Sequence, residues 1–177
     1  GLAPAQQQFG ANRTGQPLMK LGIISDTHGY VHPQIAALFD GVECILHAGD
    51  VDTEDALLEL QAIAPVIAAR GNMDRFGRLA SHREVVFHAF GSLRVCMVHD
   101  LGSPHAIKPA LIKPLRQYAP DVVIFGHTHI PYLATHHETL FLNPGSARQG
   151  RQGSPASVGL LEIVNNLPTG RILPLDT

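Results

Sequence analysis

The chain has 177 residues, 45% of them hydrophobic, which is enough for one compact domain with a sizeable core. Thirteen basic and fifteen acidic side chains give a formal net charge of −2, which argues against a dedicated nucleic-acid binder. Histidine is unusually frequent at 11 residues, and several histidines stand beside Asp or Gly where strands are predicted to end. This pattern is the first indication of a metal site.

The composition also indicates a compartment and a domain organisation. Residues 1–18 are rich in Gln, Gly and Ala and lack the apolar core of a secretory signal. We interpret them as a flexible extension or tag remnant before a single domain over residues 19–177. No apolar run reaches the roughly 20 residues of a membrane span, so we expect a cytoplasmic protein with no membrane partner. Cys44 and Cys96 lie in apolar runs and are predicted to be reduced core thiols.

In the first half, short apolar runs alternate with helical stretches. Strands are predicted at residues 18–25, 42–47 and 66–69. After the first strand, Pro33 and Gly41 bound a short helix. After the second, Asp52 or Thr53 caps a helix whose first turn is acidic. The alternation predicts a β-α-β-α-β unit with parallel strands.

In the second half, residues 84–90 and 93–98 flank a two-residue turn, which is typical of an antiparallel hairpin. Further strands are predicted at 121–125, 132–136, 139–142, 157–164 and 171–173. Three prolines disfavour an uninterrupted helix over residues 103–118, so we expect a broken helix or a loop over the site there. The predicted fold class is α/β, with two packed mixed β-sheets flanked by helices in four layers.

Five short polar signatures follow predicted strands. They are Asp26-Thr27-His28-Gly29, Gly49-Asp50, Gly71-Asn72, His99 and Gly126-His127-Thr128-His129. Because ligands bind at the carboxyl ends of strands in α/β sheets, signatures spread over about a hundred residues can converge on one crevice. Asp-x-His and His-x-His each place two ligand side chains two residues apart, so that both can point toward one ion. Asp50 is the expected bridging ligand, since one carboxylate can hold two ions.

With these blocks in this order, the sequence resembles the metallophosphoesterase (calcineurin-like phosphoesterase) superfamily from residue 19 to about residue 164. It is most similar to the small bacterial and archaeal phosphodiesterases, on two further blocks: Gly71-Asn72-Met73-Asp74 and Asn143-Pro144-Gly145-Ser146. The resemblance implies the four-layer metallophosphoesterase sandwich. It also implies a ligand set: one divalent ion on Asp26, His28 and His129, a second on Asn72, His99 and His127, and Asp50 between them.

Two divalent ions can activate a shared hydroxide and clamp phosphoryl oxygens, so no protein nucleophile is needed. The predicted activity is hydrolysis of a small phosphodiester by a hydroxide that bridges the ions, with Asp50, His99 and His127 as the catalytic residues. Mixed oxygen and nitrogen ligands admit manganese, iron, cobalt, nickel or zinc, and of these we expect two Mn²⁺ ions. Neither the natural ester nor the oligomeric state is indicated, and a homo-oligomer is possible.

Met73 stands where phosphatase relatives carry a histidine that protonates the leaving oxygen, and methionine cannot donate that proton. This favours diesters or aryl esters, or else protonation by water, Asp74 or His105. The second hypothesis is a phosphomonoesterase or nucleotide pyrophosphatase on the same site. The third is a noncatalytic scaffold, like the metallophosphoesterase-fold subunit of retromer, and the presence of all seven ligands argues against it.

Weaker expectations concern charged residues near the signatures. Because guanidinium matches phosphate oxygens, we expect substrate contacts from Arg70, Arg75 and Arg148. Asn72 is expected to contact the substrate as well. Asp74 and Asp100 are candidates for hydrogen bonds to ligands or to metal-bound water. His47 is expected to support the loop before Asp50 without binding a metal.

Overall fold

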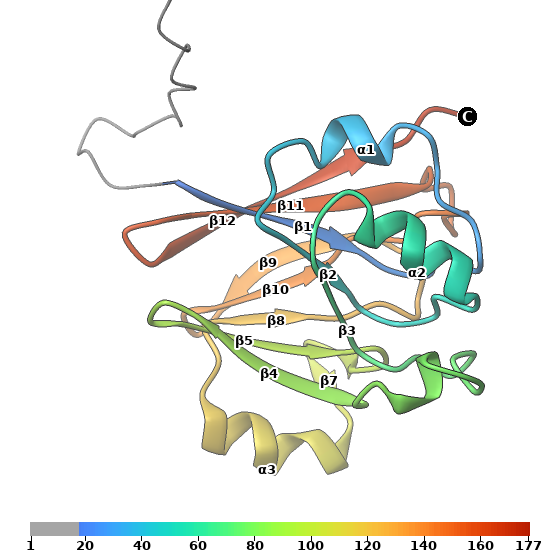
Figure 1. Ribbon diagram of the computed structural model, residues 1–177. Coiled ribbons are helices and arrows are strands. Elements are labelled where there is room, and N and C mark those ends of the chain that lie inside the picture. Colours follow the sequence, from blue (N-terminus) through green and yellow to red (C-terminus); the bar gives the residue numbers. More distant parts are fainter. Residues whose placement is uncertain (1–17) are drawn as a thin grey trace, which may run out of the picture.

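The computed structural model describes residues 18–177, so the predicted extension lies outside the described residues except for Leu18. The strands form two five-stranded mixed sheets and one short hairpin (Figure 1). The first sheet has the order β12-β11-β1-β2-β3 and the second the order β4-β5-β8-β10-β9. This confirms the predicted α/β class with two mixed sheets.

The first sheet contains the predicted parallel unit. Its strands are β1 (Met19–Ile24), β2 (Cys44–His47), β3 (Val66–Ala68), β11 (Ser157–Val164) and β12 (Leu167–Pro174). As predicted, β1, β2 and β3 are parallel, while β11 is antiparallel to β1. β12 begins at Leu167 and not at 171, because Asn165 and Asn166 both adopt positive φ and close a tight hairpin from β11.

Two helices connect the parallel strands. α2 (Glu54–Gln61) is capped by Thr53, whose hydroxyl accepts from the Ala56 N–H at 3.2 Å, so Thr53 and not Asp52 is the cap. α1 spans only Ile35–Leu38, and the helix predicted over 33–41 is therefore too long. Packing of Ile35 and Phe39 against the sheet fixes this single turn, which is too short to be stable on helix propensity alone.

The second sheet combines the predicted hairpin with a parallel core. Its strands are β4 (Val85–Phe90), β5 (Leu93–Val98), β8 (Val122–Ile124), β9 (Tyr132–His136) and β10 (Thr139–Asn143). β4 and β5 pair antiparallel across the two-residue turn, as predicted. β8 runs parallel to both β5 and β10, so β5 and β8 end at the same edge of the sheet.

The proline-containing segment differs from its prediction. β6 (Gly102–Ser103) and β7 (Ala106–Ile107) form a small hairpin, and a single helix, α3 (Pro109–Tyr118), follows. Pro109 occupies the first turn, where its missing N–H has no intrahelical partner, and Pro114 removes only one helical hydrogen bond. Leu111 packs on the second sheet and offsets that loss. The expected broken helix or loop is therefore wrong over 109–118. A further short turn, η1 (Leu79–Ser81), follows β3.

Alternating side chains build the four layers. Ile23 of β1 lies in the cluster between the two sheets, whereas the next residue, Ile24, packs under α1. In β5, Met97 faces the first sheet and Cys96 faces α3. Both faces of the central strands of each sheet are therefore buried, with α1 and α2 outside the first sheet and α3 outside the second (Figure 1). The four-layer prediction is confirmed.

Both cysteines are buried free thiols, as predicted. Burial raises the pKa of Cys96 to about 12, so this thiol stays protonated at neutral pH. Within residues 18–177, no helix combines the length and the apolar character needed to cross a membrane.

Candidate metal centre

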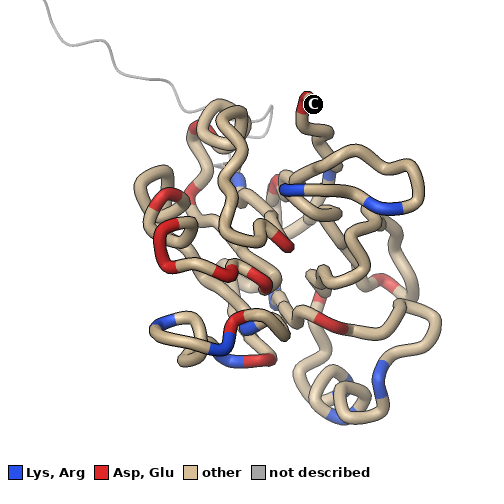
Figure 2. The backbone as a smooth tube through the Cα atoms, turned by 90° about the vertical axis from the view of Figure 1, so that its right-hand side faces the viewer, with Lys and Arg blue, Asp and Glu red and all other residues tan. Residues whose placement is uncertain are grey.

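The five predicted signatures meet at the edge where β1, β2, β3, β5 and β8 end (Figure 1). Backbone hydrogen bonds join their loops. The Asp26 N–H donates to the Gly49 carbonyl at 3.0 Å, and the Gly126 N–H donates to the His99 carbonyl at 2.9 Å. Figure 2 looks onto this edge and shows acidic and basic positions interspersed over the described loops.

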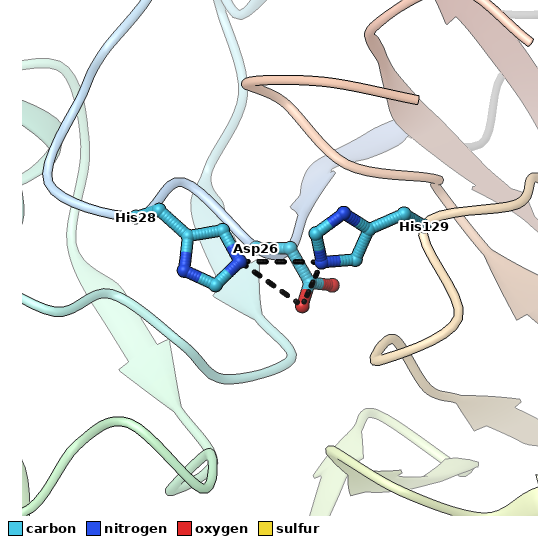
Figure 3. Close-up of side chains that lie close together, drawn as sticks. All are labelled: Asp26, His28 and His129. Carbon is cyan, nitrogen blue, oxygen red and sulfur yellow. Dashed lines mark hydrogen bonds and ion pairs between the residues drawn. The ribbon is translucent and has the colours of Figure 1, made fainter. Parts of the chain in front are cut away.

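The first group consists of Asp26, His28 and His129 (Figure 3). The Nε2 atoms of the two imidazoles lie 3.2 Å apart, and Asp26 Oδ1 lies 3.2 Å from His129 Nε2 and 3.9 Å from His28 Nε2. His28 Nδ1 contacts Asp52 Oδ2 at 3.0 Å, and His129 Nδ1 donates to the Gln149 carbonyl at 3.2 Å. These outer acceptors accept a hydrogen bond from each Nδ1 atom, so both Nε2 atoms are directed toward the carboxylate.

The second group surrounds His99. Its Nε2 lies 3.3 Å from Asp50 Oδ2, 3.0 Å from Asn72 Oδ1 and 3.3 Å from His127 Nδ1. Its Nδ1 donates to the Ala48 carbonyl at 2.7 Å, again directing Nε2 inward. All seven predicted ligands are thus brought together, although their assignment to individual ions stays a prediction.

Asp26 Oδ1 lies between the two groups and has His99 Nε2 at 3.9 Å in addition to its own histidines. Among the described residues it is a buried oxygen that accepts no hydrogen bond. Burial opposes ionisation of Asp26, but the His129 and His99 imidazoles outweigh it and hold the pKa of this carboxyl below its ordinary value. An ionised carboxylate with a free buried lone pair has the chemistry of a cation ligand. The sequence assigned the bridging position to Asp50, and that prediction is not decided by this geometry.

The remaining charges also suit a cation. Burial opposes ionisation of Asp50, but His99 and the Met73 N–H, which donates to Oδ1 at 2.9 Å, hold the pKa of Asp50 below its ordinary value. Burial disfavours protonated His99, yet Asp50 and Asp26 outweigh it and raise the pKa of His99. The candidate metal centre therefore attracts positive charge, as either a proton or a metal ion. The donor set of carboxylates, imidazoles and an amide fits the divalent metals named above.

The backbone of the centre is strained. Five of the seven predicted ligands adopt the left-handed region that side chains rarely occupy: Asp26, His28, Asp50, His127 and His129. Each such residue costs on the order of 1 kcal/mol, and clusters of them mark functional sites. The fold thus holds these side chains in place at the expense of local stability.

The three predicted arginine contacts lie at the rim. Arg148 Nη1 donates to the His28 carbonyl at 2.6 Å, and Arg75 Nε donates to the Asn72 carbonyl at 2.8 Å. Arg70 forms an ion pair with Glu84. Arg75 and Arg148 are therefore tied to the backbone of ligand residues, whereas contact of any of the three with a phosphate stays a prediction.

The two predicted acidic neighbours of the ligands have different places. Asp74 is buried and accepts from the N–H groups of Asp50, Asp52 and Gly71 at 2.9–3.0 Å, so it joins the loops after β2 and β3. Asp100 pairs with Lys108 and accepts from Gly102. Its carboxylate lies 3.8 Å from His127 Nε2, so among the ligand histidines it faces His127 and not His99.

Sequence reasoning missed Asp52. The sequence predicts it only as a candidate helix cap, but its carboxylate contacts His28 Nδ1 and orients that ring, and its backbone has a positive φ of 69°. The second acid of Gly49-Asp50-Val51-Asp52 carries no periodic signal. Only the spatial proximity of the first two loops reveals its role.

His47 supports the loop from inside, as predicted. The Gly49 N–H donates to its Nδ1 at 3.1 Å, so the neutral ring carries its proton on Nε2 and donates to Thr27 Oγ1 at 3.0 Å. Complete burial lowers the pKa of His47 from 6.5 to about 4.

This shift predicts a pH dependence of stability. Between pH 6.5 and 4 the unfolded chain binds a proton at His47 that the folded chain does not, so the free energy of unfolding decreases by about 3 kcal/mol as pH falls. Urea unfolding in chelator should show His47→Asn to be less stable than wild type at pH 7.5, with the gap narrowing toward pH 4. The exposed His88→Asn is the control. A gap that stays constant over this range would contradict the assignment.

Comparison with known proteins agrees with this architecture. The model of the calcineurin-like phosphoesterase superfamily domain matches residues 19–166. A probable metallophosphoesterase of Methanothermobacter thermautotrophicus is 37% identical over 150 residues, covering 82% of this chain and 86% of that protein. Phosphodiesterase YfcE of Escherichia coli K12 is 30% identical over 171 residues, covering 82% and 88%.

Solved structures share the fold. One described as a novel archaeal phosphodiesterase superimposes with a TM-score of 0.68 at 26% identity, covering 88% of this chain and 100% of that one. Vps29 of Entamoeba histolytica complexed with zinc superimposes with a TM-score of 0.63 at 21% identity, covering 88% and 98%, which shows likeness of fold alone. With the family match over residues 19–166, the chain belongs to the calcineurin-like phosphoesterase superfamily, in its small bacterial and archaeal branch, and is a hydrolase of phosphoester bonds.

Proposed function

We propose that the protein is a two-metal phosphodiesterase that acts on a small diester. The observation that carries this proposal is the buried, unpaired Oδ1 of Asp26, surrounded by three imidazole Nε2 atoms within 3.9 Å. Asp26, His28 and His129 would hold one divalent ion, and Asn72, His99 and His127 the other, with Asp50 bridging. When bound, Mn²⁺ or a similar ion would supply Lewis acidity and a hydroxide nucleophile at neutral pH.

The residues of the chain support this chemistry by positioning. Hydrogen bonds from three imidazole Nδ1 atoms to Asp52 and to the carbonyls of Gln149 and Ala48 fix the orientation of these rings. At the rim, Arg148 and Arg75 place positive charge where a phosphate would approach the ligands. Their carbonyl partners hold these guanidinium groups in place, which lowers the entropy lost when a phosphate binds.

The surroundings of Met73 favour a diester. Its backbone N–H binds Asp50, so the residue adjoins the centre, and methionine has no proton to donate. Asp74 is engaged by three backbone N–H groups, so its carboxylate is not placed as a proton donor to a leaving alcohol. The His105 ring packs on His136, and proton donation by His105 stays an alternative. A relative named phosphodiesterase supports the same reading.

The test is the initial rate of bis(p-nitrophenyl) phosphate hydrolysis by chelator-stripped protein, with and without Mn²⁺. We expect Mn²⁺ to restore turnover in the wild type and not in Asp50→Asn. Absence of turnover with Mn²⁺, Fe²⁺, Co²⁺, Ni²⁺ or Zn²⁺ in folded protein would overturn the proposal and favour a noncatalytic scaffold.

The Met73 argument predicts substrate preference. The value of kcat/KM for bis(p-nitrophenyl) phosphate should exceed that for the alkyl monoester glycerol 2-phosphate, whose leaving alkoxide needs a proton, by at least about tenfold. Met73→His supplies an imidazole and should raise hydrolysis of this alkyl monoester on the order of tenfold, whereas the Met73→Gln control should not. A wild type that prefers the monoester would instead support the phosphomonoesterase hypothesis.

A further inference from the structure

A pocket of about 340 Å³ opens beside the second group of predicted ligands. Asn72, His99 and His127 belong both to its lining and to the metal centre, whereas Asp26, His28 and His129 do not line it. A molecule bound at the metal centre can therefore extend into this pocket only on the side of the second ligand group. The volume is at the lower end for ligand sites, which suits one part of a substrate and not a whole large ligand.

Three elements build the apolar part of this pocket. Val85 begins β4, Val98 ends β5, and Ala110 and Leu111 lie in the first turn of α3. Leu111 is buried in the core under α3, whereas Ala110 is exposed and presents its small side chain at the opening. The pocket thus has a rigid apolar base and a rim that one side chain could fill.

The charged residues of the lining are balanced. Arg70 pairs with Glu84, and Lys108 pairs with Asp100. Each cation is already neutralised by a carboxylate of the same lining, so a further anion would have to displace a carboxylate or lie beside it. The pocket therefore disfavours a negatively charged occupant and offers donors and acceptors at the edge of a neutral one.

We propose that this pocket binds one uncharged, flat substituent of the phosphodiester, of the size of an aryl ring or a nucleobase. The proposal rests on the proposed function and deepens it by naming the substrate class. The apolar base contacts the face of the ring, and the paired charges meet its polar edge. A second phosphate, as in a nucleotide pyrophosphate, lies beside the carboxylates of Glu84 and Asp100, and the lining offers it no unpaired cation. A simple alkyl substituent leaves most of the pocket unfilled.

The test measures binding of phosphonates to the Mn²⁺-loaded full chain by calorimetry, since these compounds carry one substituent on phosphorus and are not hydrolysed. Phenylphosphonate should bind at least about tenfold more tightly than methylphosphonate, because the ring buries apolar area in the pocket. Ala110→Phe fills the pocket and should abolish the preference. Gln117→Phe, an exposed position on the same helix outside the pocket, should retain it.

A negatively charged probe tests whether the charges of the lining residues are balanced. Wild type should bind 4-carboxyphenylphosphonate several-fold less tightly than phenylphosphonate, and Glu84→Gln should narrow that difference. Equal binding of phenyl- and methylphosphonate by wild type, or an unchanged preference in Ala110→Phe, would overturn the pocket assignment. Turnover of bis(p-nitrophenyl) phosphate is measured on the same samples. If wild type hydrolyses the diester but shows no preference for phenylphosphonate, only the pocket assignment is overturned. If wild type prefers phenylphosphonate but does not hydrolyse the diester, only the proposed hydrolytic function is overturned.

Discussion

Replacing Asp26 by Asn should lower Mn²⁺-dependent turnover of bis(p-nitrophenyl) phosphate by at least about 1000-fold, because the substitution removes the charge of the carboxylate between the two ligand groups. Without metal, the variant should be about as stable as wild type. One amide oxygen can still accept from Ser25 Oγ and the His127 N–H. The amide nitrogen takes the place of Oδ1 and can donate to His129 Nε2, which lies 3.2 Å from that position.

Thermal unfolding separates this loss of metal affinity from loss of fold. For wild type, Mn²⁺ at a hundred times its dissociation constant should raise Tm by about 5–10 °C, since ligation adds about 2.7 kcal/mol. Asp26→Asn should show little of this rise, and the exposed Asp40→Asn should show all of it. An Asp26→Asn protein that keeps the full metal-dependent rise and a tenth of the turnover would contradict the role given to Asp26.

The elements that sequence predicts best are those whose two faces are both buried. Continuous apolar runs such as 44–46 and 95–98 must be covered on each side, so their pattern indicates central strands whatever their neighbours are. The lengths of α1 and β12 depend on packing of Phe39 and on the Asn165-Asn166 turn, which periodicity does not report. α3 escaped prediction because the first-turn position makes Pro109 compatible with a helix.

In the candidate metal centre, too, the sequence predicts some features and tertiary packing decides the others. The seven ligand positions follow from short motifs at strand ends, since parallel strands of one sheet end at one edge. Asp52 and the pocket beneath α3 could not be predicted in this way. Each depends on the distance between segments that are far apart in sequence, such as the 3.0 Å contact between Asp52 and His28. Motifs thus identify donor atoms, whereas packing decides how these are oriented and what lies next to them.

Replacing Gly71 by Ala should destabilise the protein by about 3 kcal/mol or more and abolish turnover. A Cβ atom at Gly71 would lie 2.1 Å from Asp50 Oδ1 and 2.2 Å from the Asp50 backbone nitrogen. The two segments cannot separate without breaking further contacts, because Asp74 Oδ2 accepts from both the Asp50 and the Gly71 N–H. Overpacking against a fixed backbone costs typically 1–3 kcal/mol or more, and here it also displaces a predicted ligand.

Gly41→Ala separates steric overlap from backbone preference. Gly41 has a φ of 76° with nothing within 4 Å of an added Cβ, so alanine there costs about 1 kcal/mol for left-handed geometry alone and leaves turnover unchanged. Gly71 has no such φ, so any larger loss at Gly71 measures the contact with Asp50. Urea unfolding in chelator and turnover with Mn²⁺ are measured for both variants. If Gly71→Ala is no less stable than Gly41→Ala and remains active, the loops after β2 and β3 are not held as closely as the predicted metal centre requires.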